Sequence, residues 1–177
     1  MQRLLVMTVI GADRPGLVES VAALVAEHGG NWLESSMSRL GGQFAGILRV
    51  EVPAERERAL VSALEGLDAK GLHVVVHSDQ PSATAEGARV SLLEVIGHDR
   101  PGIVRQISHT LAAAGVNVEE LQTERSSAAM SGESLFKARA KVSIPTSVDR
   151  EQLRGKLEKI AEDLIVDISF SEIVRNG

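Results

Sequence analysis

Cysteine is absent from the sequence, and aromatic residues are scarce. Without cysteine the chain forms no disulfide, and it offers neither a thiolate nucleophile nor a thiolate ligand for a metal ion. Aromatic residues make up 2% of the chain, with no tyrosine, one tryptophan and three phenylalanines. Recognition of single-stranded RNA depends on aromatic rings that stack on the bases, so this composition argues against an RNA-binding module.

Long hydrophobic runs and an excess of basic residues are also missing. No apolar run is long enough to cross a membrane, and no basic leader with a cleavage site follows Met1, so we expect a cytoplasmic protein without membrane contact. The net charge is −5, and acidic residues outnumber basic ones in both halves of the chain. This balance disfavours direct binding to nucleic acid.

One segment of ten residues occurs twice. The sequence VIGADRPGLV begins at Val9, and VIGHDRPGIV begins at Val95, 86 residues later. Three further pairs have the same spacing: Gly29 and Gly115, Asn31 and Asn117, and Glu34 and Glu120. Glycine, proline and asparagine are favoured where backbone angles are unusual, so their shared positions indicate shared turns and a duplicated domain.

A small, polar stretch at residues 79–87 separates the two copies. It lacks apolar periodicity and contains one proline, which is typical of a linker. We therefore predict a first domain at residues 1–80, a linker at 81–88 and a second domain at 89–177. Each domain is small enough to bury only a modest core, so we expect the two to support one another.

Each copy shows the pattern strand, helix, strand, strand, helix, strand. In the first copy we expect strands at residues 4–10, 31–40, 43–52 and 72–77, a helix from after Asp13 to Gly29, and a second helix at 60–67. In the second copy we expect strands at 89–96, 117–125, 135–144 and 164–170, with helices at 103–111 and 153–161. This order predicts an α+β protein of two ferredoxin-like βαββαβ domains in tandem.

Many functions share this fold, so only the residues of a site can distinguish among them. A metal chaperone would need a cysteine pair, and the best histidine candidates, His73 and His77, would lie about 13 Å apart on a strand. An acylphosphatase-like enzyme would need an anion-binding loop with a positioned arginine. Arg14 and Arg100 stand near the right place, but the rest of that loop pattern is missing. We predict no catalytic residue, no metal site and no cofactor.

A family resemblance rests on the GADRPG and GHDRPG loops, each after an apolar strand, and on the GGN and GVN sequences that close the following helices. These sequences resemble the loops of ACT domains. Two such copies without an attached catalytic domain are similar to the glycine cleavage system transcriptional repressor family. The resemblance implies a non-enzymatic regulator that senses a small amino acid, with glycine favoured. It also implies action through a regulatory protein partner on the transcription of amino-acid metabolism genes.

Two alternatives to this sensor stay open. The first is a ligand-free adaptor that uses the same surfaces only for assembly. The second is an acylphosphatase-like enzyme.

The resemblance also implies a place for the ligand, between the first loop of one domain and the helix-to-strand junction of a neighbour. A helix N-terminus there would offer free N–H groups to a carboxylate. The candidate residues are Gly11, Asp13, Gly16 and Asn31 in the first copy, and Gly97, His98, Asp99, Gly102 and Asn117 in the second. The best-known serine-binding loops carry histidine at the position of Gly11 and Gly97, and asparagine two residues later. The same residue types also suit helix caps and turns, with Asp13 and Asp99 as N-caps.

Charged residues alternate along one predicted strand of the second copy. Lys137, Arg139 and Lys141 lie on one face, and the preceding strand carries Glu120, Gln122 and Glu124. This pattern predicts neutralisation across the strands rather than a stripe that binds a partner. The single tryptophan, Trp32, suits either an interface or the core.

The predicted strands at 31–40 and 117–125 should lie at sheet edges. Neither contains proline, so each is free to pair with another strand. In ACT assemblies, which the chain resembles, two sheets lie side by side with their helices on one face. We expect that arrangement within the chain or in a homodimer, with Asp13, Asn31, Asp99 and Asn117 near the contact.

Overall fold

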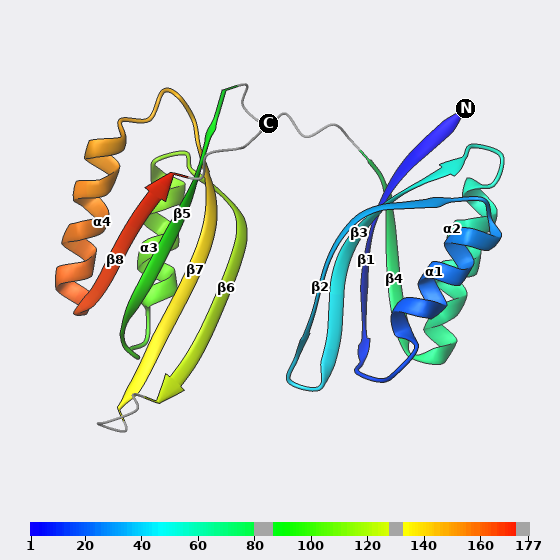
Figure 1. Cartoon of the computed structure of the whole chain (residues 1–177), viewed down its shortest axis with the longest axis horizontal. Coiled ribbons are helices and arrows are strands. Elements are labelled where there is room, and N and C mark those ends of the chain that lie inside the picture. Colours follow the sequence, from blue (N-terminus) through cyan, green and yellow to red (C-terminus); the bar gives the residue numbers. More distant parts are fainter. Residues whose placement is uncertain (80–86, 128–132, 173–177) are drawn as a thin grey trace. The chain divides into compact units, whose positions relative to one another are not determined.

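The computed structural model describes residues 1–79, 87–127 and 133–172 of the chain. These residues belong to two units, Met1–Ser82 and Ala83–Gly177 (Figure 1). Most of the predicted linker, at 81–88, lies outside the described residues, as does the tip of the second hairpin.

Unit 1 contains a four-stranded antiparallel sheet with helices on one face (Figure 1). Its elements are β1 (Gln2–Ala12), α1 (Leu17–Glu27), β2 (Asn31–Leu40), β3 (Gln43–Pro53), α2 (Glu57–Glu65), the 3₁₀ helix η1 (Gly66–Lys70) and β4 (Leu72–Ser78). The strand order is β2-β3-β1-β4. The second helix starts three residues before the predicted 60–67, and its α-helical part ends before Gly66, where the chain tightens into 3₁₀ turns.

Unit 2 repeats this architecture, with the strand order β6-β7-β5-β8. Its elements are β5 (Arg89–His98), α3 (Ile103–Ala113), β6 (Asn117–Ser127), β7 (Ser134–Ile144), α4 (Arg150–Leu164) and β8 (Val166–Glu172). The predicted tandem of ferredoxin-like βαββαβ domains is therefore confirmed. The prediction that β2 and β6 lie at sheet edges is also confirmed.

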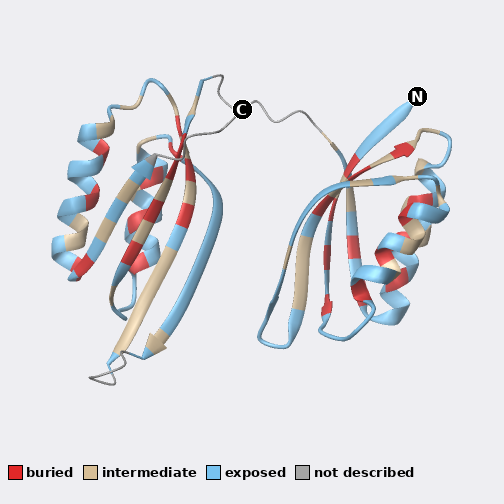
Figure 2. Ribbon diagram, in the orientation of Figure 1, coloured by how far each residue is buried: buried red, intermediate tan, exposed pale blue. Residues whose placement is uncertain are grey.

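Each unit has its own hydrophobic core between the sheet and the helices (Figure 2). Buried residues follow the helical period on α1 (Leu17, Val21, Val25) and on α3 (Ile103, Ile107, Leu111), as predicted. Trp32 is half-buried and packs against the core of unit 1. None of the helices in the described parts of the chain has the length and apolar character needed to cross a membrane.

The sheet faces that carry no helices differ between the units. In unit 2, Lys137 forms an ion pair with Glu124 (Nζ–Oε1 3.4 Å) and Lys141 forms one with Glu120 (Nζ–Oε1 3.3 Å). Arg139 binds Glu94 of β5 (Nη2–Oε1 2.7 Å) instead of a residue on β6. The predicted cross-strand neutralisation is confirmed for the two lysines. In unit 1 the same face exposes Ile10, Ile47 and Val75, whereas unit 2 exposes Ile96 at the position of Ile10 but has Arg139 and Ser169 at the register positions of Ile47 and Val75.

Candidate functional site

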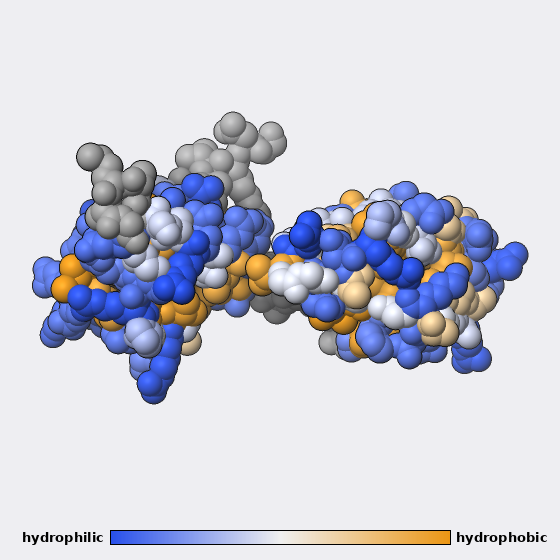
Figure 3. Space-filling view, turned by 90° about the horizontal axis from the view of Figure 1, so that it is seen from below, coloured by the Kyte–Doolittle hydropathy of each residue, from blue (hydrophilic) through white to orange (hydrophobic). Residues whose placement is uncertain are grey.

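The β1–α1 loop of unit 1 and the β2–β3 hairpin lie at the same end of the sheet (Figure 1). The antiparallel register places Ala12, at the end of β1, opposite Gln43, at the start of β3. Figure 3 looks onto this end of unit 1, where small hydrophobic patches lie among hydrophilic residues. The β5–α3 loop and the β6–β7 hairpin are the equivalent segments of unit 2.

The two helices that follow these loops begin after a glycine. Gly16 is the N-cap of α1 with φ of 90°, and Gly102 is the N-cap of α3 with φ of 96°. Neither helix has a side-chain cap, so the prediction that Asp13 and Asp99 are N-caps is wrong. The Asp-Arg-Pro-Gly sequence forms a turn that ends in a left-handed glycine, and the N-cap of each helix therefore lies three residues after the aspartate.

The two aspartates bind the neighbouring hairpin instead. Asp13 forms an ion pair with Arg39, near the end of β2 (Nε–Oδ2 3.1 Å), and Asp99 forms one with Arg125 of β6 (Nε–Oδ2 2.8 Å). Neither arginine was among the predicted site residues. Arg39 and Arg125 are themselves 86 residues apart, so the repeat spacing was the signal that could have found them.

Backbone packing accounts for Gly11 and Gly97. A Cβ on Gly11 would lie 2.5 Å from the carbonyl oxygen of Gly71, and one on Gly97 would lie 2.7 Å from Cα of Val166. The last strand of each unit, or the turn before it, therefore lies too close to Gly11 or Gly97 for a residue with a side chain to fit there. His98, next to Gly97, is exposed and lies near Glu133 (Nδ1–Oε2 3.7 Å).

Asn31 and Asn117 lie away from the loop aspartates of their own units. Each is the exposed first residue of an edge strand, β2 or β6, beyond the C-terminus of α1 or α3. The 11 residues of α1 span about 16 Å. Asn31 donates a hydrogen bond from Nδ2 to the Glu51 carboxylate (3.3 Å). Within one unit the structure thus does not bring the predicted asparagine to the predicted loop.

A shallow, open hollow lies beside the β1–α1 loop. It is lined by Asp13, Arg14, Gly16, Leu17, Val18, Glu19 and Phe44. The first N–H groups of α1 have no partner within the helix, and a Cβ on Gly16 would meet no atom within 4 Å. The Arg14 side chain is directed away to η1, where its Nη2 donates to the carbonyl oxygen of Lys70 (2.6 Å).

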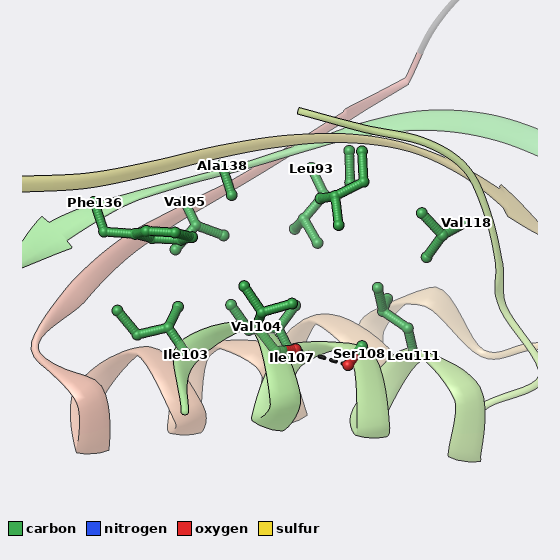
Figure 4. A pocket seen from close by; sticks show the side chains of 12 residues that line it. Leu93, Val95, Ile103, Val104, Ile107, Ser108, Leu111, Val118, Phe136 and Ala138 are labelled. Carbon is green, nitrogen blue, oxygen red and sulfur yellow. Dashed lines mark hydrogen bonds between the residues drawn. The ribbon is translucent and has the colours of Figure 1, made fainter. Parts of the chain in front are cut away.

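Unit 2 contains an apolar cavity of about 40 Å³ between α3 and the sheet (Figure 4). Its lining is hydrophobic except for Ser108, whose hydroxyl donates to the carbonyl oxygen of Val104 (2.7 Å). The cavity has no charged group for a zwitterion. Ala140 borders it at the register position where unit 1 has Leu48, so the cavity reflects a smaller core residue.

The histidine, aspartate and glutamate side chains that the structure describes do not form a metal site. Within residues 1–79, 87–127 and 133–172, no group of three or more histidine, aspartate or glutamate side chains is placed to hold a metal ion. His73 pairs with the carboxylate of Asp68.

Comparison with known families agrees with this architecture. Residues 3–77 match a family model described as ACT domain, and residues 91–162 match a second model of the same description. The chain belongs to the ACT-domain family, with two ACT domains in tandem.

Two crystal structures resemble the chain over nearly its whole length. One is of an unknown protein from Galdieria sulphuraria, with a TM-score of 0.89 and 30% identity over 98% of this chain and 100% of that one. The other is of a protein assigned as a glycine cleavage system transcriptional repressor, with a TM-score of 0.70 and 20% identity over 98% of both chains. At 20% identity the second likeness concerns the fold.

A curated relative matches a shorter segment. The UPF0237 protein MK1213 of Methanopyrus kandleri is 43% identical over 47 residues, which are 27% of this chain and 52% of that protein. The match therefore spans about half the length of that relative.

Proposed function

We propose that the chain is a non-enzymatic regulator that senses a small amino acid and acts through a protein partner. Membership of the ACT family in both halves of the chain supports a regulatory role. The observation that carries the proposal is the duplicated loop, in which a left-handed glycine precedes the first free N–H groups of a helix. A Cβ would meet no atom within 4 Å at Gly16, and at Gly102 it would meet the Gln106 side chain at 3.9 Å. Such N–H groups are suited to a carboxylate.

Glycine is the favoured ligand. The hollow beside the β1–α1 loop is shallow and offers no enclosed pocket for a long side chain. The name of the similar repressor structure points to glycine metabolism as the regulated process. We propose transcription of amino-acid metabolism genes as the output, reached through a partner protein in the cytoplasm and not by direct binding to DNA.

The two copies should differ in affinity for a carboxylate. In the first turn of α1 unit 1 carries Glu19, and unit 2 has Arg105 at the equivalent position of α3. A glutamate near the helix N-terminus repels a bound carboxylate, whereas an arginine attracts it. We therefore expect tighter binding in unit 2.

A ligand-free adaptor is the second candidate, and one observation favours it. The negative charge of a loop aspartate could pair with the ammonium group of an amino acid, but both aspartates already pair with Arg39 and Arg125. In this case the exposed edge strands β2 and β6 would serve assembly alone, through the side-by-side sheets predicted for the chain or a homodimer.

Calorimetry and thermal shift with glycine, serine and alanine would decide between sensor and adaptor. The sensor predicts heat and a raised melting temperature with glycine. Arg105→Glu should weaken both, and the matched variant Glu19→Arg should strengthen them. Neither heat nor a thermal shift with any amino acid would refute the sensor. Turnover of acyl phosphates that is lost in Arg14→Ala or Arg100→Ala would instead support an enzyme.

The partner is best sought by a pull-down with and without glycine. The proposal predicts a captured regulatory protein whose yield changes with glycine, and no binding of the purified chain to an isolated promoter fragment at physiological salt. Tight, sequence-specific binding of the purified chain to DNA would contradict it.

A further inference from the structure

Both units contain the same attachment of loop to hairpin. The amide of Asp13 donates to the carbonyl oxygen of Gly42 (2.9 Å), and the amide of Asp99 donates to that of Ser134 (2.9 Å). The carboxylates of the same aspartates bind Arg39 and Arg125. Each aspartate is thus attached to the neighbouring hairpin twice, through its backbone and through its side chain.

The two edge strands have diverged elsewhere. Between β2 and β6, the residues that match at the repeat spacing are an asparagine, a glutamate and the arginine. The glutamates form cross-strand ion pairs, Glu34 with Arg49 and Glu120 with Lys141. The arginine is the one of the three that contacts the loop in both units.

We propose that Arg39 and Arg125 are positioning residues for the β1–α1 and β5–α3 loops. Each holds its loop aspartate on the hairpin, and so keeps the following left-handed glycine and the helix N-terminus in a preformed arrangement. The aspartate acts as the counter-ion of this arginine and not of a ligand. The importance of the loop for sensing rests on the proposed function, but the attachment itself does not.

The two loops should depend on their arginines to different degrees. The β1–α1 loop has a third attachment, from Arg14 Nη2 to the carbonyl oxygen of Lys70 (2.6 Å). In the part of unit 2 that the structure describes, the equivalent Arg100 makes no such bond. Loss of Arg125 should therefore loosen its loop more than loss of Arg39.

Amide hydrogen exchange in the full chain, followed by NMR, tests this assignment. The reporters are the Asp13 and Asp99 amides, each protected by its bond to the hairpin. Arg125→Ala should speed exchange at Asp99 by roughly two- to five-fold, the range expected for an exposed ion pair. Arg39→Ala should have a smaller effect at Asp13. Both arginine side chains are at least 70% exposed, so neither truncation disturbs a core.

Two control variants separate positioning from a general effect. Arg154→Ala removes another exposed pair, that with Glu158 on α4 (Nε–Oε1 2.9 Å), and should leave the Asp99 amide unchanged. The charge-swapped variant, with Asp99→Arg and Arg125→Asp together, should restore slow exchange of the backbone amide at position 99. Unchanged exchange in Arg125→Ala, an equal effect of Arg154→Ala, or no rescue by the swap would each overturn the assignment.

Glycine titration of the same variants separates this assignment from the sensor. If the chain binds no amino acid but slow exchange of the Asp99 amide still depends on Arg125, the positioning role is supported and the sensor is refuted. Glycine binding together with exchange that ignores Arg125 refutes the positioning role and leaves the sensor intact.

Discussion

Ala140 of β7 is a position where a larger side chain should stabilise unit 2. It is 5% exposed and borders the apolar cavity of about 40 Å³ beneath α3. Valine adds two carbon atoms, and burying them contributes about 0.8 kcal/mol each. Filling the cavity at about 24 cal/mol per Å³ gives about 1 kcal/mol. These gains total about 2.6 kcal/mol, from which the strain of fitting a branched side chain into a packed core subtracts about 1–2 kcal/mol. We therefore expect Ala140→Val to raise the free energy of unfolding by about 1 kcal/mol.

Urea denaturation followed by two signals would measure this effect. The single tryptophan, Trp32, lies in unit 1, so its fluorescence reports that unit, whereas circular dichroism reports both. The midpoint of the unit 2 transition should rise by roughly 0.5–1 M urea. A shift of the Trp32 transition as well would indicate that the units stabilise each other.

A matched control separates cavity filling from strand propensity. Ala45→Val makes the same change on β3, at a half-buried position on the sheet face without helices, where only a small gain in strand propensity is expected. If Ala140→Val gains no more than Ala45→Val, or destabilises the chain, the cavity does not accept a side chain and the reasoning is refuted.

Three further predictions concern the stability of the units. Cutting the chain in the linker should leave halves that melt at lower temperatures alone than when mixed, and identical melting in both states would contradict mutual support. Gly11→Ala should lower the free energy of unfolding by about 1–3 kcal/mol, because its Cβ would meet a backbone oxygen. Gly155→Ala, with open space around it in α4, should raise it by about 0.5–1 kcal/mol. A urea titration that ranks the two variants the other way would contradict the packing. Hydrogen bonds to Glu119 and Glu120 raise the pKa of Lys141. The stabilisation of the fold by these bonds is therefore complete below the unfolded pKa of 10.5 and is lost as pH rises through the folded value. Lys141→Gln should make the free energy of unfolding fall less steeply at alkaline pH, and an unchanged pH dependence would contradict this role of Lys141.

The order of helices and strands was predictable because it depends on hydrophobic periodicity and on the glycine and proline residues that end each element. The strand from Asn31 to Leu40 begins after a glycine pair and ends before another, so its limits are local properties of the sequence. The N-cap residues of α1 and α3 were not predictable in the same way. Aspartate before a helical pattern usually caps the helix, but here a left-handed glycine three residues later is the N-cap, and the carboxylate pairs with an arginine on another strand.

The candidate site was predictable only in part for a similar reason. The loop residues are adjacent in the sequence, so the repeat identified them. Their partners, Arg39 and Arg125, become neighbours only through the antiparallel register of the hairpin, which depends on the fold as a whole. The same limit applies to Gly11, whose lack of a side chain is explained by a turn about sixty residues later.

The left-handed glycine at the start of α1 and α3 has a consequence for how such duplicated genes diverge. Any other residue at Gly16 or Gly102 would be strained whether or not a ligand binds, so selection for folding alone preserves the loop signature. A copy that had lost its ligand would keep the signature unchanged. Substitutions that follow the loss of the ligand would instead accumulate at neighbouring positions that have no backbone constraint. Positions 19 and 105 are examples, because the two copies already carry opposite charges there.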